Sequence, residues 1–179
     1  MIWLIAGASH TGKTVLAQKM LERYHVPYLS MDHLKMGLIR SGQTALTPMD
    51  DEQLTDYLWP IVREMIKTAI ENEQSLIVEG CYIPYDWHRD LTDEYLQKIR
   101  CRWLIMSETY IREHMADIRS HACDVEKRMD DSDLNEQWLI DQNREALRQC
   151  QAHGCAYFLI DGDYDVNPEE WGSSHGNHP

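Results

Sequence analysis

The feature that most constrains the fold is an eight-residue segment near the amino terminus, Gly7–Thr14, which reads GASHTGKT. It follows the apolar run 2–6, which predicts a short buried strand, and it precedes residues 13–24, whose apolar positions have helical spacing. In the pattern G-x4-G-K-[ST], the glycines let the backbone curl until successive N–H groups point inward. Those groups and the helix N-terminus together form an anion-binding site. The segment therefore predicts an α/β fold with a phosphate-binding loop.

This loop predicts the contacts to a nucleoside triphosphate, which we expect to be ATP. The Lys13 ammonium should reach the β- and γ-phosphates, and the Thr14 hydroxyl should bind Mg²⁺. His10 either contacts a phosphate or occupies a position that tolerates many residues. A chance glycine turn is disfavoured because the pattern and its context are both present. The predicted nucleotide-binding residues are Gly7, Ala8, Ser9, His10, Thr11, Gly12, Lys13 and Thr14.

The rest of the chain alternates strand-like and helix-like segments. This alternation is typical of a three-layer α/β fold with a mainly parallel sheet, in which ligands bind at the carboxyl ends of the strands. Further strands are expected at 27–30, 75–78, 99–106 and 155–160. Helices are expected at 34–40, 50–73 (kinked or divided at Pro60), 108–120 and 133–149.

Composition limits the classes of partner and the compartment. The 179 residues suit one domain, expected over 1–170, with a flexible tail at 171–179. A net charge of -13 disfavours binding to nucleic acid. The apolar run 2–6 lacks a basic flank and is too short to span a bilayer, so neither a signal peptide nor a membrane protein is expected. The five cysteines have no CxxC spacing, which favours reduced thiols and a cytoplasmic protein. The sequence does not indicate an oligomeric state.

Other nucleotide-binding classes lack their markers in this chain. There is no NKxD-type guanine reader and no complete LSGGQ-type signature, and the strand that should carry a DE pair ends in Glu79-Gly80. The Gly7–Thr14 loop, the acidic Asp32 after the second strand, Val78-Glu79-Gly80 and a late arginine-bearing segment resemble the adenylate-kinase-like small-molecule kinases. That group includes shikimate, gluconate and 2-phosphoglycerate kinases and the zeta-toxin relatives. The resemblance covers about residues 1–165.

The resemblance implies a five-stranded sheet of order 2-3-1-4-5 and a small helical lid. It also implies Mg²⁺-dependent transfer of phosphate from ATP to a hydroxyl or phosphate of a small molecule. A nucleoside monophosphate or a sugar nucleotide is an alternative acceptor. A non-catalytic ATP-binding switch and a stand-alone ATPase are alternatives to the transferase itself.

Asp32 is the first candidate for the acceptor side. In the kinases that the chain resembles, an Asp after this strand orients or deprotonates the acceptor hydroxyl, or holds Mg²⁺ through water. Asp is also a preferred N-cap, so Asp32 could instead cap a helix beginning near Leu34. The residues that follow, Asp32-His33-Leu34, lack the second carboxylate of the DxD found in shikimate-type kinases.

Other candidates lie near Asp32 or after the third strand. His33, Lys35 and Arg40 could hold an anionic acceptor or form a solvated helix face. Glu79 could position a magnesium-bound water, bind an acceptor hydroxyl, or be solvated. Gly80 should allow the backbone to approach the substrate closely. The aromatic and polar segment 81–89, which includes Tyr82, forms either a wall of the acceptor site or a packed surface loop.

The predicted lid lies near residues 119–132. In related kinases, arginines here neutralise charge on the transferred phosphoryl group, and closure excludes water. Arg119 and Arg128 are the candidates, and Arg128-Met129-Asp130-Asp131 resembles the RxDD of adenylate kinase lids. Both arginines could instead form ordinary surface ion pairs.

Overall fold

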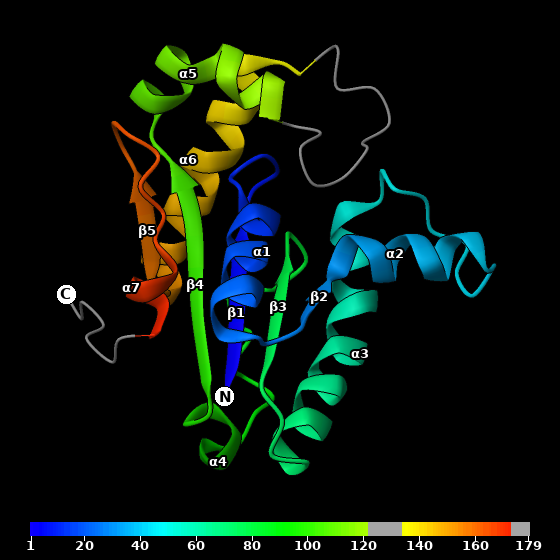
Figure 1. The fold of residues 1–179 in the computed structure, drawn as a ribbon. Coiled ribbons are helices and arrows are strands. Elements are labelled where there is room, and N and C mark those ends of the chain that lie inside the picture. The colour runs from blue at the N-terminus through cyan, green and yellow to red at the C-terminus, as the bar shows by residue number, and fades with distance from the viewer. Residues whose placement is uncertain (122–133, 173–179) are drawn as a thin grey trace.

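A central sheet of five parallel strands organises the computed structural model, which describes residues 1–121 and 134–172 (Figure 1). The order of the strands is β2-β3-β1-β4-β5, so the predicted α/β class and strand order are both confirmed. The strands are β1 (Ile2–Gly7), β2 (Tyr28–Ser30), β3 (Leu76–Gly80), β4 (Ile99–Met106) and β5 (Tyr157–Ile160).

Seven helices lie in the described part of the chain. The short α4 and α7 were not expected from the sequence. The helices are α1 (Lys13–Tyr24), α2 (Met31–Arg40), α3 (Asp51–Glu71), α4 (Asp93–Leu96), α5 (Glu108–His121), α6 (Glu136–His153) and α7 (Pro168–Gly172).

The boundaries of three helices differ from those expected. α2 begins at Met31 rather than near Leu34, because the chain turns into the helix directly after the extended Ser30. α3 runs through Pro60 without division. Pro60 is exposed, so water can solvate the carbonyl that the proline leaves without a helical partner. α6 begins at Glu136, where the Asn135 side chain accepts a hydrogen bond from the Trp138 amide and caps the helix.

Alternating side chains place two buried clusters on opposite faces of the sheet. Leu4 of β1 and Val78 of β3 belong to the cluster that packs against α3 and the carboxyl-terminal half of α6. Ile5 and Ile77, one position away, belong to the cluster that packs against α1 and α5. In Figure 1, α1 lies in front of the sheet and α6 behind it. Both faces are therefore covered, as a parallel sheet requires.

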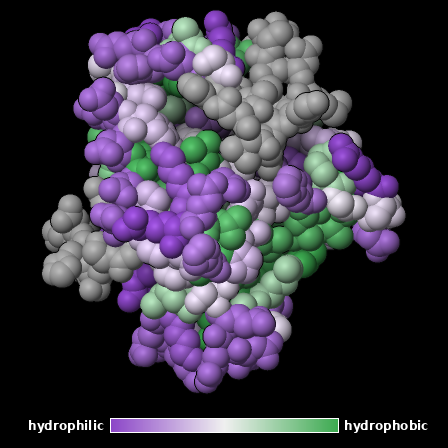
Figure 2. Space-filling model, viewed as in Figure 1, coloured by the Kyte–Doolittle hydropathy of each residue, from purple (hydrophilic) through white to green (hydrophobic). Residues whose placement is uncertain are grey.

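The carboxyl ends of β1, β3 and β4 lie together at the top of Figure 1, where the loop between β1 and α1 also lies. On the side of the molecule shown in Figure 2, the surface over α1 is mainly hydrophilic, and a hydrophobic area lies beside it toward α3. Among the described residues, no helix is long and apolar enough to cross a membrane.

Candidate active site

The loop between β1 and α1 depends on two glycines. Gly7 has a φ of 144°, and a Cβ there would lie 2.5 Å from the carbonyl oxygen of Leu104 in the neighbouring strand β4. Gly12 has a φ of 82° and precedes α1. His10 also has a positive φ, 66°, which a non-glycine residue rarely adopts. The loop is thus held in a backbone conformation that few sequences allow.

The Lys13 side chain lies inside this loop. It is 4% exposed, and its Nζ donates a hydrogen bond to the carbonyl oxygen of Ala8 at 2.6 Å. The Thr11 hydroxyl donates to the same carbonyl at 3.0 Å. A single cation enclosed by curled backbone fits the terminal phosphates of a nucleotide.

Thr14 and Glu79 meet beside the loop. The Thr14 hydroxyl donates to Oε2 of Glu79 at 3.3 Å, and Glu79 is 1% exposed. Glu79 reaches α1 because it points to the same face of β3 as Ile77. Oxygen ligands of this kind suit Mg²⁺, and the residues present therefore fit a magnesium–nucleotide complex.

Tyr164, from the segment after β5, covers the other side of the loop. Its hydroxyl donates to the carbonyl oxygens of Thr11 at 3.3 Å and Gly12 at 3.4 Å. Burial raises the pKa of Tyr164, so the hydroxyl stays protonated and remains a donor. Sequence reasoning missed this residue, because nothing local relates it to a loop more than 150 positions earlier.

A cavity of about 750 Å³ extends from the loop toward α2, α3 and α6. Its wall includes Gly7–His10 of the loop and four residues predicted for the acceptor side, which the fold brings together. These four are Asp32, Lys35, Arg40 and Tyr82. Tyr85, from the predicted wall segment 81–89, also lines it. Its wall further includes residues that sequence reasoning did not single out, among them Asp51, Thr55, Trp103, Asn135, Trp138 and Gln142.

A chain of polar contacts crosses one wall of this cavity. Nζ of Lys35 lies 2.5 Å from Oδ1 of Asp32 and donates to the Tyr82 hydroxyl at 2.9 Å. That hydroxyl donates to Oδ1 of Asp51 at 3.2 Å. Burial raises the pKa of Tyr82 to about 12. Burial alone would lower the pKa of Lys35, but its hydrogen bonds to Asp32 and Tyr82 outweigh that effect and raise it.

Asp32 does not cap α2. It lies in the first turn, and Ser30 occupies the N-cap position, so the alternative interpretation of Asp32 as a cap is wrong. The dipole of a helix favours a carboxylate in the first turn. From this position the Asp32 side chain also lines the cavity.

Gly80 does not contribute to the cavity wall formed by the described residues. A Cβ at this position would lie 2.7 Å from Cβ of Met31. The packing of α2 on β3 is therefore one reason for glycine at this position, and the approach of Gly80 to a substrate stays a prediction.

The predicted lid is described only at its beginning. The Arg119 guanidinium donates to the carbonyl oxygen of Leu134 at 2.9 Å and so links α5 to the segment before α6. Arg128 lies outside the described residues. The roles of Arg119 and Arg128 in a lid remain predictions.

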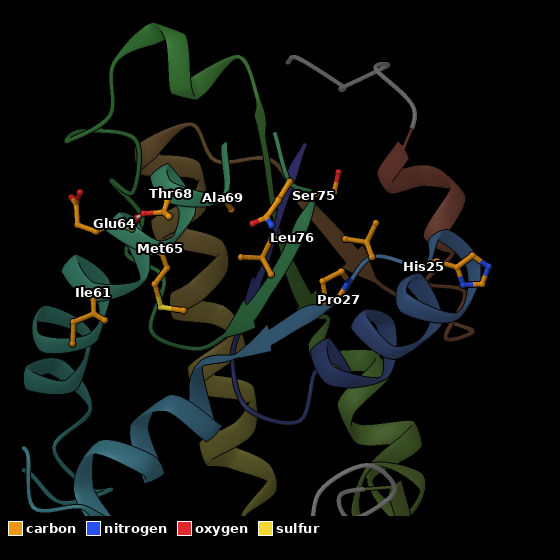
Figure 3. Close-up of a pocket in the computed structure, with 11 residues that line it drawn as sticks. His25, Pro27, Ile61, Glu64, Met65, Thr68, Ala69, Ser75 and Leu76 are labelled. Atoms are coloured by element: carbon orange, nitrogen blue, oxygen red, sulfur yellow. Dashed lines mark hydrogen bonds between the residues drawn. The ribbon is translucent and has the colours of Figure 1, made fainter. Parts of the chain in front are cut away.

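A second cavity, of about 900 Å³, lies away from the phosphate-binding loop. Figure 3 shows its lining, which comes from α3 and from the segments that lead into β2 and β3. Pro27 and Leu76 mark the amino ends of those strands. Ligands of parallel sheets bind at the opposite, carboxyl ends, so this cavity is not the candidate active site.

Several solved structures with a similar fold are kinases of small molecules. Shikimate kinase from Acinetobacter baumannii matches with a TM-score of 0.55 and 13% identity, over 96% of this chain and 88% of that one. A sugar kinase from Janibacter sp. matches with a TM-score of 0.51 and 14% identity, over 95% and 88%. Deoxyadenosine kinase from M. mycoides matches with a TM-score of 0.51 and 12% identity, over 96% and 94%.

No family model matches the sequence, and no curated protein matches it significantly. The similarity to P-loop small-molecule kinases is therefore one of fold, at low sequence identity.

Proposed function

We propose that the protein is a Mg²⁺-dependent phosphotransferase that moves the terminal phosphate of ATP to a small molecule. The observation that carries this proposal is the continuity of one cavity between the phosphate-binding loop and Asp32. A stand-alone ATPase needs only water as its acceptor, and a switch needs no acceptor cavity. A cavity of about 750 Å³ leading away from the phosphates is large enough for a metabolite.

The residues divide the work between two ends of the site. The loop amides and Lys13 bind the phosphates, and Thr14 with Glu79 holds the metal ion through oxygen atoms. Bound magnesium would neutralise charge on the phosphate oxygens. Asp32 accepts a hydrogen bond from the acceptor hydroxyl and directs its oxygen toward the terminal phosphate. Phosphoryl transfer depends mainly on such positioning and on charge neutralisation.

Release of ADP from ATP and Mg²⁺ against a panel of small molecules tests the proposal. The panel should include nucleoside monophosphates and sugar nucleotides. In the wild type, one acceptor should stimulate ADP release. Lys13→Ala and Asp32→Asn should each lower the stimulated rate by about 10²-fold or more.

Two exposed residues away from the site supply matched control variants. Lys98 precedes β4 at the opposite end of the sheet, and Asp56 lies on α3. Lys98→Ala and Asp56→Asn should leave the stimulated rate unchanged. Turnover without any acceptor that survives Asp32→Asn would instead indicate an ATPase, and ATP binding without turnover would indicate a switch.

A further inference from the structure

We propose that the acceptor is an uncharged polyhydroxy compound, such as a sugar or cyclitol, and that Lys35 positions Asp32 rather than binding an anion. This inference rests on the proposed function. It replaces the sequence-based expectation that Lys35 and Arg40 hold an anionic acceptor.

The first support is that the Lys35 charge is already neutralised within the protein. Its side chain is 12% exposed, and its Nζ contacts Oδ1 of Asp32 and the Tyr82 hydroxyl. An ammonium group has three hydrogens to donate, so these two contacts leave one. The Tyr82 hydroxyl in turn donates to Asp51, which places a second carboxylate close to the lysine.

The second support is the charge balance of the cavity. The described residues that line it include two carboxylates, from Asp32 and Asp51, and two cations, from Lys35 and Arg40. Arg40 is exposed at the end of α2. An acceptor whose hydroxyl reaches Asp32 lies among Asp32, Lys35 and Asp51, where negative charge exceeds positive charge. A carboxylate or phosphate on such an acceptor would be repelled.

The third support is the chemistry of the remaining wall. Aromatic side chains contribute to it: Trp138 is 44% exposed, and the partly buried ring of Tyr85 is backed by the buried Trp103, with the ring centres 5.4 Å apart. Flat apolar faces suit the C–H face of a saturated ring. Hydroxyl groups on the rim of that ring can bond to Thr55, Asn135 and Gln142, which also line the cavity.

Matched pairs of acceptors that differ in charge test the inference. D-Glucose is compared with D-glucuronate, and methyl shikimate with shikimate, in the ADP-release assay. We expect the uncharged member of the productive pair to have at least a fivefold higher kcat/KM. This is the factor expected for two unit charges about 4 Å apart in bulk water.

Asp51→Asn adds a test within the protein. The asparagine can still accept the Tyr82 hydrogen bond but removes a negative charge, so the preference for the uncharged acceptor should shrink at least about fivefold. Asp56→Asn, on the same helix but outside the cavity wall, should leave the ratio unchanged. Circular dichroism and thermal unfolding verify that both variants fold.

The outcomes separate this inference from the proposed function. A preference for the charged member of a pair, or a ratio that Asp51→Asn does not alter, would overturn the inference and leave the phosphotransferase intact. Failure of every acceptor in both panels would overturn the proposed function, and the inference would fall with it.

Discussion

Replacing Gly12 by alanine would place a methyl group against the ring of Tyr164. The new Cβ would lie 2.0 Å from the Tyr164 hydroxyl oxygen and 2.8 Å from Cζ. The backbone also has a left-handed conformation here, with φ 82° and ψ 20°. A residue with a Cβ costs about 1–2 kcal/mol in that conformation. Overpacking a buried contact costs about 1–3 kcal/mol more. The variant should therefore lose about 2–5 kcal/mol of its free energy of unfolding.

A matched control separates the two contributions. Gly154, at the end of α6, has a similar left-handed conformation, with φ 66° and ψ 29°, and a Cβ there would meet nothing within 4 Å. Gly154→Ala should therefore cost only the backbone contribution, about 1–2 kcal/mol. In a Tyr164→Ala background, Gly12→Ala should cost a similar amount, because its clash is gone. The double-mutant cycle should show a coupling of about 1–3 kcal/mol.

Urea unfolding followed by tryptophan fluorescence measures the free energies of all five proteins, the four of the cycle and Gly154→Ala. Equal costs for Gly12→Ala in both backgrounds would refute the reasoning, because the contact with Tyr164 would then contribute nothing. So would a Gly12→Ala variant no less stable than Gly154→Ala. Either result would mean that Tyr164 does not press on the phosphate-binding loop in solution.

Two further predictions concern stability alone. Asn143 is 1% exposed and accepts a hydrogen bond at 2.9 Å from the backbone amide of Met106 at the end of β4. Asn143→Ala leaves that amide without its acceptor and should destabilise the protein by about 1–3 kcal/mol in urea unfolding, and a loss below about 0.5 kcal/mol would contradict it. His25 ends α1 with a φ of 55°, so His25→Gly should raise stability by about 0.5–1 kcal/mol. The same change at His33, inside α2, should lower stability by about 1 kcal/mol. Because the two expected effects have opposite signs, equal changes at the two histidines would contradict this pair of predictions.

The parts of the site that the sequence predicted depend on short segments of chain. Gly7–Thr14 forms the loop because its glycines, lysine and threonine are consecutive and directly join a strand to a helix. The pair Asp32 and Lys35 is also local, since residues three apart on a helix are neighbours. The ion pair between Lys35 and Asp32 was nevertheless not predicted, because the sequence does not show that the two side chains turn toward each other rather than toward a ligand.

The parts that were missed depend on contacts between distant segments. Asp51 joins the polar contacts of Lys35 and Asp32 through Tyr82, 31 positions later, and Tyr164 reaches the loop across 152 positions. Such contacts depend on how helices and loops pack on the sheet, and no local pattern encodes that packing. The same holds for the contact of Gly80 with Met31, which is far from it in the sequence.

The division between the proposed metal and acceptor ends follows from the alternation of side chains along β3. Val78 points to the face that packs against α3, and Glu79 points to the face covered by α1, where it meets Thr14. The acceptor cavity, in contrast, includes Trp103, which belongs to the cluster on the α3 face. A shift of one residue in the pairing of β3 with β1 would exchange the faces and bury the Glu79 carboxylate in the apolar cluster beneath α3. The hydrophobic pattern that fixes the register of the sheet therefore also keeps Glu79, beside Thr14, and the Trp103 wall of the proposed acceptor cavity on opposite faces of the sheet.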